Sequence, residues 1–192
     1  LNSKNYGIPQ HRERLFCIGF REKTDFKFPA PIELKYRMYD FLEDWSDSCF
    51  YNVQSKCKEL GEHDFNRFIF PVSEVEDKYY LSEKVAKYVL AGGTKNFKTS
   101  TKTDLDVARP LLHSMHKMHR AGVDNYVTFN KNKGINGIRK LTPRECHRLM
   151  GFRDTFNIVT SNTAAYMEAG NSIVVDVLIS ILKQLDITKY GV

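Results

Sequence analysis

The sequence predicts an α/β protein, because a strand-like run near its start is followed by several helical patterns. Residues 14–20 form the run, which is apolar and rich in aromatic and β-branched side chains. Residues 82–91 and 173–185 carry apolar side chains at helical spacing. With 192 residues, the chain can build one sizeable core, or one lobe and a smaller module.

The first expected elements are a strand, an irregular region and a helix. The strand at residues 14–20 should be buried, and it follows Pro9, which a strand tolerates near its start. Residues 22–75 are irregular, with prolines and mixed charge. The helix should begin at Ser82, a good N-cap residue, and end at a glycine at position 92 or 93. Its apolar face consists of Val85, Ala86, Val89 and Leu90.

A loop-rich region and a well-marked helix follow. Residues 94–138 hold many Thr, Asn, Lys, His and Gly residues and few apolar runs, which is typical of a loop-rich surface module. In "KLTPREC", Thr142 is a good N-cap, Pro143 suits the first helical position, and Glu145 completes a capping box. This helix should run to about residue 150, with Gly151 at its end.

Two helices should complete the chain. A short one at residues 164–169 should stop at Gly170. A Gly-Asn-Ser turn at residues 170–172 should then open the last helix, which we expect from Ile173 to Leu185. Its apolar stripe consists of Val174, Val177, Leu178, Ile181, Leu182 and Leu185.

Composition narrows the class of protein. The chain carries 29 Lys and Arg against 23 Asp and Glu, a net charge of +6, which fits a polyanionic partner such as nucleic acid. Its four cysteines form no CxxC pair, which favours a reduced, intracellular setting. No apolar run of about 18 residues and no signal peptide occur, so we expect neither a membrane span nor secretion. The chain starts with Leu1, and we expect it to be a piece of a longer protein.

Two stretches suggest polar sites. In "IPQHRERLFCIGF", Gln10, Arg12 and Arg14 would share one face of a strand, and arginine suits bidentate binding of a carboxylate, a phosphate or a base edge. The alternative is a solvated strand end that pairs with Glu13. In "AGNSIVVDVLISI", free N–H groups at the start of a helix would suit a polar or anionic ligand. The alternative there is an ordinary helix capped by Ser172.

Together with a third stretch, these motifs resemble the C-terminal half of the cytosine-5 DNA methyltransferases. "NYGIPQHRERLFCIGF" looks like the eighth conserved block of that family, "IRKLTPRECHRLMGF" like the ninth and "YMEAGNSIVVDVL" like the tenth. The three stretches occur in the order of the family. A long variable region separates the first two, at the place of the target-recognition domain. The resemblance favours an enzyme of the bacterial restriction-modification kind.

The resemblance implies a division of the chain. Residues 1–22 would supply strands to a Rossmann-like methyltransferase domain. Residues 23–138 would hold the variable region and form a smaller, irregular, mixed α/β target-recognition lobe. Residues 139–192 would hold the helix of the ninth block and the helices that return to the catalytic domain.

The resemblance also implies residue roles. In the family, the target cytosine is flipped out of double-stranded DNA, a cysteine attacks its C6, and C5 takes the methyl group of S-adenosyl-L-methionine. Arg14 matches the arginine that donates to the base O2, while Arg12 and Gln10 would brace this catalytic pocket and reach backbone or phosphate. Asn171 and Ser172 match positions in one wall of the cofactor site.

The variable region would contact DNA. The expected residues offer cationic, aromatic or amide side chains to phosphates and base edges: Arg109, His113, His116, Lys117, His119, Arg120, Asn125 and Tyr126, with Arg139 of the ninth block as structural first and DNA-facing second. The three histidines are spaced by three residues. A structural zinc site wants a fourth ligand, and no cysteine lies nearby, so we expect no metal.

Parts of the family pattern are absent from this sequence. The family's nucleophile lies in a Pro-Cys-Gln segment, and none of the four cysteines has these neighbours. The segment of the assisting glutamate and the glycine-rich cofactor turn are absent too. We therefore expect a fragment or subunit that is inactive alone, poorly soluble or self-associating, and partnered by an N-terminal catalytic half. The expected location is the bacterial cytoplasm, near the nucleoid.

Two alternatives remain open at this stage. One is a DNA-specificity subunit without catalysis of its own, which serves a separately encoded partner. The other is a tRNA cytosine-5 methyltransferase, which the long, basic variable region disfavours.

Overall fold

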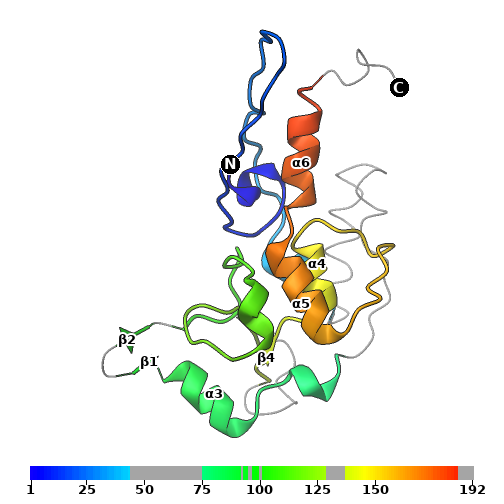
Figure 1. The fold of residues 1–192 in the computed structure, drawn as a ribbon. Coiled ribbons are helices and arrows are strands. Elements are labelled where there is room, and N and C mark those ends of the chain that lie inside the picture. The colour runs from blue at the N-terminus through cyan, green and yellow to red at the C-terminus, as the bar shows by residue number, and fades with distance from the viewer. Residues whose placement is uncertain (44–74, 92, 95–96, 100, 129–136, 186–192) are drawn as a thin grey trace.

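The computed structural model describes residues 1–43, 75–91, 93–94, 97–99, 101–128 and 137–185 (Figure 1). In these ranges the 3₁₀ helices are η1 (Ser3–Tyr6), η2 (Met38–Phe41), η3 (Asp77–Tyr79) and η4 (His113–His116). The α-helices are α3 (Glu83–Leu90), α4 (Pro143–Arg148), α5 (Asn162–Asn171) and α6 (Val175–Leu182). The strands are β1 (Gly93–Thr94), β2 (Phe97–Lys98), β3 (Tyr126–Val127) and β4 (Arg139–Lys140).

The described strands form two short antiparallel ladders. β1 pairs with β2, with Thr94 opposite Phe97. β3 pairs with β4, with Tyr126 opposite Lys140 and Val127 opposite Arg139. A Rossmann-like sheet is therefore not seen in the described part of the chain, which is mostly helix and extended backbone around these ladders.

The capping box of α4 is confirmed. Thr142 Oγ1 accepts a hydrogen bond from the Glu145 N–H at 3.2 Å, and Glu145 Oε2 accepts one from the Thr142 N–H at 2.8 Å. Pro143 occupies the start of the helix. The helix itself ends at Arg148, slightly earlier than expected, and Gly151 follows with a φ of 85°, a conformation that glycine adopts without a steric penalty.

The Gly-Asn-Ser turn closes one helix rather than opening the next, so that prediction is wrong. α5 continues through Gly170 to Asn171, and the Ser172 N–H donates back to the Glu168 carbonyl at 2.9 Å. α6 begins only at Val175, after extended backbone at Val174, and Ser172 does not cap it. The turn residues therefore satisfy α5 first, because its last carbonyls need donors.

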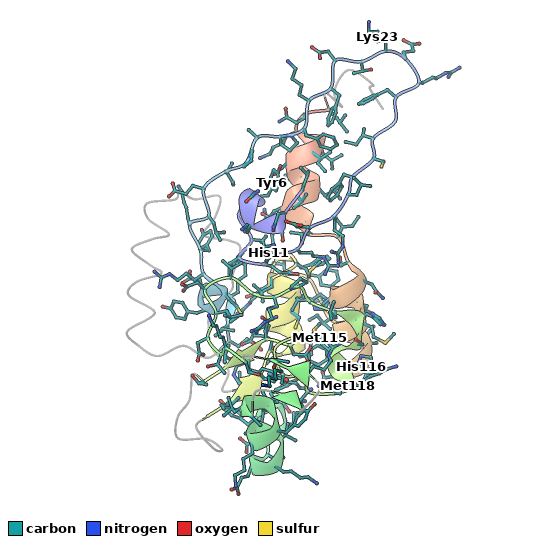
Figure 2. All side chains as sticks on the ribbon, turned by 90° about the vertical axis from the view of Figure 1, so that its left-hand side faces the viewer. Tyr6, His11, Lys23, Met115, His116 and Met118 are labelled. Carbon is teal, nitrogen blue, oxygen red and sulfur yellow. The ribbon has the colours of Figure 1, made fainter. Side chains whose placement is uncertain are left out.

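The prediction of a buried strand at residues 14–20 is also wrong for this structure. These residues belong to an extended arm beside α6, with Lys23 at the far end (Figures 1 and 2). Leu15 is 91% exposed and Phe20 is 39% exposed. A strand needs neighbouring strands for its N–H and C=O groups, and neither described ladder includes this run. The arm instead packs its own rings, Phe20 on Phe26 and Phe26 on Phe28.

One main core joins segments that are far apart in the sequence. It combines Ile8 and Phe41 from the first part of the chain with Leu149 after α4, Ala169 of α5 and Val177 of α6, among others. A smaller cluster packs α3 against β3 and β4 through Leu81, Ala86, Val89, Tyr126 and Ile138. The expected inner face of α3 is buried at Ala86 and Val89, whereas Leu90 is exposed.

Residues 162–182 are long and apolar enough, by composition, to cross a membrane. The extended backbone at Ser172 and Val174 divides this segment into α5 and α6. Ala165, Tyr166 and Ala169 on α5 are buried inside the protein. A span needs about 20 continuous helical residues whose backbone groups are all paired, so these features fit core helices better.

Candidate functional site

A cavity of about 270 Å³ lies where the first segment of the chain, residues 1–17, meets the end of α5 and the start of α6. Its polar lining includes Arg12, Arg14, Asn171 and Ser172. Its apolar lining includes Leu15, Phe16, Val174 and Val177. The structure thus brings the predicted catalytic arginines together with the predicted cofactor-wall residues, although the two pairs lie at opposite ends of the sequence.

Arg14 lies exposed at this cavity, on a firmly held backbone. Its N–H donates to the Leu1 carbonyl at 3.0 Å, and its own carbonyl accepts from the Leu1 amino group at 2.8 Å. Its guanidinium donates to the Glu13 carbonyl at 2.6 Å. The Glu13 carboxylate lies instead near His11 Nε2, at 3.6 Å, and near Asn2 Nδ2, at 3.3 Å. The guanidinium retains further donors for a ligand.

Gln10 and Arg12 point into the protein. They are 0% and 4% exposed, whereas His11 and Glu13 between and beside them are exposed. Gln10 Nε2 donates to the Leu149 carbonyl at 2.8 Å, and Arg12 donates to the carbonyls of Leu111, Gly170 and Ser172 at 2.8, 2.8 and 3.0 Å. Burial, with the charge of Arg14 second, lowers the pKa of Arg12 to about 10. Arg12 therefore stays charged at neutral pH, and carbonyl dipoles offset its desolvation.

The end of α5 offers a second polar edge to the cavity. Asn171 is exposed there, and Ser172, which is half-buried, donates its hydroxyl to the Ile173 carbonyl at 3.1 Å. Val174 and Val177 beneath them are buried. A few polar groups over an apolar floor are typical of sites for nucleoside-sized ligands. Both predicted cofactor-wall residues therefore lie at this cavity.

The residues expected to contact DNA gather around η4 and the loop that follows it. His113 and Lys117 are exposed, while Arg109, His116 and His119 are half-buried; Figure 2 labels His116 in the same region as Met115 and Met118. Arg120 is largely committed within the protein, because it donates to Asp124 Oδ1 at 2.6 Å and to Ser114 Oγ at 3.2 Å. Among these residues, His113 and Lys117 are therefore the ones whose side chains are exposed.

Three of the residues expected to contact DNA are buried, and for Arg139 the structural role expected first is the one that its contacts show. Asn125 accepts from the Arg109 N–H at 2.8 Å and donates to the Arg109 carbonyl at 3.1 Å. Tyr126 is 1% exposed, and burial raises the pKa of its hydroxyl. Arg139 is 0% exposed and donates to both carboxylate oxygens of Glu145, at 2.9 and 2.7 Å. Their hydrogen-bonding groups serve the fold, since buried polar groups require partners.

The three histidines spaced by three residues do not meet as a metal site. His116 Nδ1 lies 2.9 Å from the His113 carbonyl oxygen. His119 instead lies near the Tyr126 ring, with the ring centroids 6.4 Å apart, and burial lowers the pKa of its imidazole. Within the described ranges, no three His, Cys, Asp or Glu side chains are grouped so that they could hold a metal ion.

Two features of the site were not predicted. The first is the backbone of Leu111, which Gln10 and Arg12 hold; nothing in a sequence marks a main-chain group as a partner. The second is Gly170, where an added Cβ would lie 2.2 Å from the His113 nitrogen. A glycine within a helical pattern is a signal of close packing, so the sequence contained a signal for the close approach at Gly170.

Comparisons with known proteins agree on one family. The family model described as C-5 cytosine-specific DNA methylase matches residues 1–186. The Type II methyltransferase M2.ScrFI of Lactococcus lactis subsp. cremoris is 33% identical over 96% of this chain and 43% of its own length. The Type II methyltransferase M.HhaI of Haemophilus parahaemolyticus is 33% identical over 93% of this chain and 49% of its own length. The chain spans about half the length of the relatives it matches.

Solved structures show a related fold. The Entamoeba histolytica methyltransferase EhMeth superposes with a TM-score of 0.56 at 16% identity, covering 100% of this chain and 53% of that protein. A mutant of Spodoptera frugiperda DNMT2 gives a TM-score of 0.54 at 15% identity, covering 96% of this chain and 55% of that protein. The described elements therefore form part of a methyltransferase fold.

Proposed function

The chain belongs to the family of C-5 cytosine-specific DNA methylases, and from this membership we propose that it is the C-terminal part of a DNA (cytosine-5-)-methyltransferase. In this proposal it supplies target recognition, the active-site arginine and one wall of the cofactor site. The complete enzyme transfers a methyl group from S-adenosyl-L-methionine to C5 of a flipped cytosine in a specific DNA sequence. The matching family model is described as a DNA methylase, which supports DNA over RNA as the substrate.

The cavity shared by Arg14 and Asn171 is the observation that carries this proposal. These residues come from the first and last matched motifs, and they line the same hollow. A base and a methyl donor must meet within bonding distance for transfer, so one site needs groups for both. The cavity offers a cation on one side and small polar groups on the other.

Each residue of the site has its own task in the proposed reaction. Arg14 donates to O2 of the flipped cytosine and stabilises the negative charge that develops on the ring. Gln10 and Arg12 hold the backbone around this pocket through their hydrogen bonds to main-chain groups. Asn171 and Ser172 contact S-adenosyl-L-methionine, which supplies the methyl group when bound.

The surface around η4 is proposed as the DNA-reading part of a lobe formed by residues 23–138. His113 and Lys117 contact phosphates or base edges, supported by Arg109, His116 and His119. Residues 1–22 and 139–192 belong to the catalytic domain in this division. The charge of +6 favours binding to double-stranded DNA and a place near the bacterial nucleoid.

The proposal includes an N-terminal catalytic half, in the same polypeptide or as a separate subunit, that supplies the nucleophile. Cys146 is buried, and burial raises the pKa of its thiol, which disfavours the reactive thiolate. Exposed apolar side chains lie where that half would pack: Leu15, Ile173, Leu178, Ile179 and Leu182.

Replacing Arg14 with alanine in the complete enzyme tests the proposal. We expect tritium transfer from labelled S-adenosyl-L-methionine to DNA to fall by roughly 10²-fold or more, as on loss of a donor to a developing oxyanion, while DNA affinity stays within about threefold. Arg153→Ala, at an exposed arginine outside the cavity, is the matched control and should retain transfer. Unchanged transfer in Arg14→Ala would show that the role given to Arg14 is wrong.

A further inference from the structure

Two side chains of the first segment hold the backbone of Leu111 from both sides. Gln10 Oε1 accepts a hydrogen bond from the Leu111 N–H at 3.1 Å, and Arg12 Nη1 donates to the Leu111 carbonyl at 2.8 Å. Leu111 is 2% exposed and lies two residues before η4. The start of the proposed DNA-reading turn is therefore fixed by side chains of the catalytic-pocket segment rather than by a strand or helix.

The same guanidinium of Arg12 also holds the end of α5. Its Nη2 donates to the Gly170 carbonyl at 2.8 Å and to the Ser172 carbonyl at 3.0 Å. These two carbonyls flank Asn171, in the proposed cofactor wall. The guanidinium is planar and its donors have fixed directions. One rigid group thus sets the positions of Leu111 and of the cofactor wall relative to each other.

The packing of α5 against η4 places the two segments that Arg12 bridges next to each other. Gly170 lies so close to the turn that an added Cβ would be 2.2 Å from the His113 nitrogen and 2.4 Å from the Leu112 carbonyl carbon. Both are backbone atoms, which cannot rotate away as a side chain does. This contact keeps the turn and the end of α5 close together, and the hydrogen bonds of Arg12 fix how the two are placed relative to each other.

We infer that Arg12 is a positioning residue that couples the DNA-reading turn to the cofactor wall. This inference rests on the proposed function, which assigns DNA to the turn at η4 and S-adenosyl-L-methionine to the wall at Asn171 and Ser172. A ligand that holds one segment in its bound position also holds the other through Arg12. Binding of the two ligands is then mutually favourable, and linkage requires that each raises the affinity of the other by the same factor.

The test measures the dissociation constant of S-adenosyl-L-methionine for the complete enzyme, with and without a duplex that contains the target sequence. In the wild type we expect the duplex to tighten cofactor binding by about fivefold or more, the lower end of usual couplings. Arg12→Lys keeps the charge but cannot bridge three carbonyls in the same geometry. This variant should reduce the effect to less than about twofold. Arg153→Lys, at an exposed site, should behave as wild type.

The inference is overturned if the duplex does not change the cofactor affinity of the wild type, or if the Arg12→Lys variant keeps the full effect. If Arg12→Lys does not fold, hydrogen exchange on the wild-type enzyme decides. S-adenosyl-L-methionine alone should then slow exchange in residues 111–117, and unchanged exchange there overturns the inference. An enzyme that binds neither ligand refutes the proposed function as well, whereas one that binds both without mutual effect refutes only the coupling.

Discussion

At the scale of single residues, Glu43 ties the end of η2 to the start of α4. Its carboxylate accepts from Thr142 Oγ1 at 2.5 Å, and its N–H donates to Glu145 Oε1 at 2.8 Å. Burial is the main cause of a raised pKa at Glu43, opposed by the Thr142 hydrogen bond and reinforced by the charge of Glu145. The carboxylates of Glu43 and Glu145 therefore lie with Arg139 and Arg148 in a small, partly desolvated region, where the charged form of Glu43 is disfavoured.

The raised pKa predicts a pH dependence of stability. An acid whose pKa is higher in the folded than in the unfolded state binds its proton more tightly when folded, so its contribution to stability is largest at low pH. That contribution is lost as pH rises from the ordinary glutamate pKa through the raised folded pKa. Glu43→Gln keeps an acceptor for Thr142 and does not titrate. In denaturant unfolding, its stability relative to wild type should rise across this window.

An exposed glutamate provides the control for this experiment. Glu33 lies in an exposed part of the chain, and Glu33→Gln should give an unfolding curve parallel to wild type at each pH. A constant difference between Glu43→Gln and wild type across the window would show that Glu43 is not desolvated in solution.

At this scale, the sequence predicts hydrogen-bonded pairs within one helical turn, but not pairs between residues farther apart in the chain. The capping box of Thr142 and Glu145 was predictable, because both partners lie within one helical turn. Arg139 was expected to be structural first, but its partner Glu145 was not predicted, because an arginine gives the same signal whether it meets DNA or a buried carboxylate. The alternation along extended backbone placed Gln10, Arg12 and Arg14 on one face; Gln10 and Arg12 are buried, whereas Arg14 is exposed.

At the scale of elements, the contact of α5 with η4 depends on a missing side chain. Gly170→Ala would place a Cβ 2.2 Å from the His113 nitrogen, which forces the two elements apart. We expect the free energy of unfolding to fall by about 1–3 kcal/mol, as for other overpacked contacts. We also expect weaker DNA binding, because η4 carries His113 and precedes Lys117. Denaturant unfolding and titration with duplex DNA measure the two effects.

Gly19→Ala is the matched control for this substitution, since no atom lies within 4 Å of an added Cβ there. It should leave both the free energy of unfolding and DNA affinity close to wild type. If Gly170→Ala also matched wild type, the close approach of α5 to η4 would not exist in solution.

Helices and strands could be predicted from the sequence where the residues that determine them lie within the element itself. Helices α4 and α5 have N-caps and inner faces within their own residues, so their existence was predictable. The run at residues 14–20 has the composition of a buried strand, but a strand depends on neighbours elsewhere in the chain or outside it. The start of α6 was misplaced because the Gly-Asn-Ser turn suits the end of a helix as well as its beginning.

At the scale of the whole molecule, the face of α6 is unevenly covered. Val177 and Ile181 are buried in the main core, whereas Leu178, Ile179 and Leu182 are 39%, 43% and 39% exposed. The arm lies beside this helix (Figure 1), and its Leu15 is 91% exposed. Together with the match to about half the length of the relatives, this surface fits the contact with the proposed catalytic half.

This surface predicts how the isolated chain behaves. Exposed apolar patches associate in water unless another surface covers them, so light scattering of the purified chain should show self-association. Ile179→Glu places a charge in the patch and should shift the chain toward monomer. The same change should lower methyl transfer after the chain is mixed with the catalytic half, because that half would then have to desolvate a carboxylate. Gln184→Glu, at an exposed polar site after α6, adds the same charge and should alter neither result. A wild-type chain that is monomeric at all concentrations, or an Ile179→Glu variant that pairs and methylates as wild type, would place the contact with the catalytic half on another face.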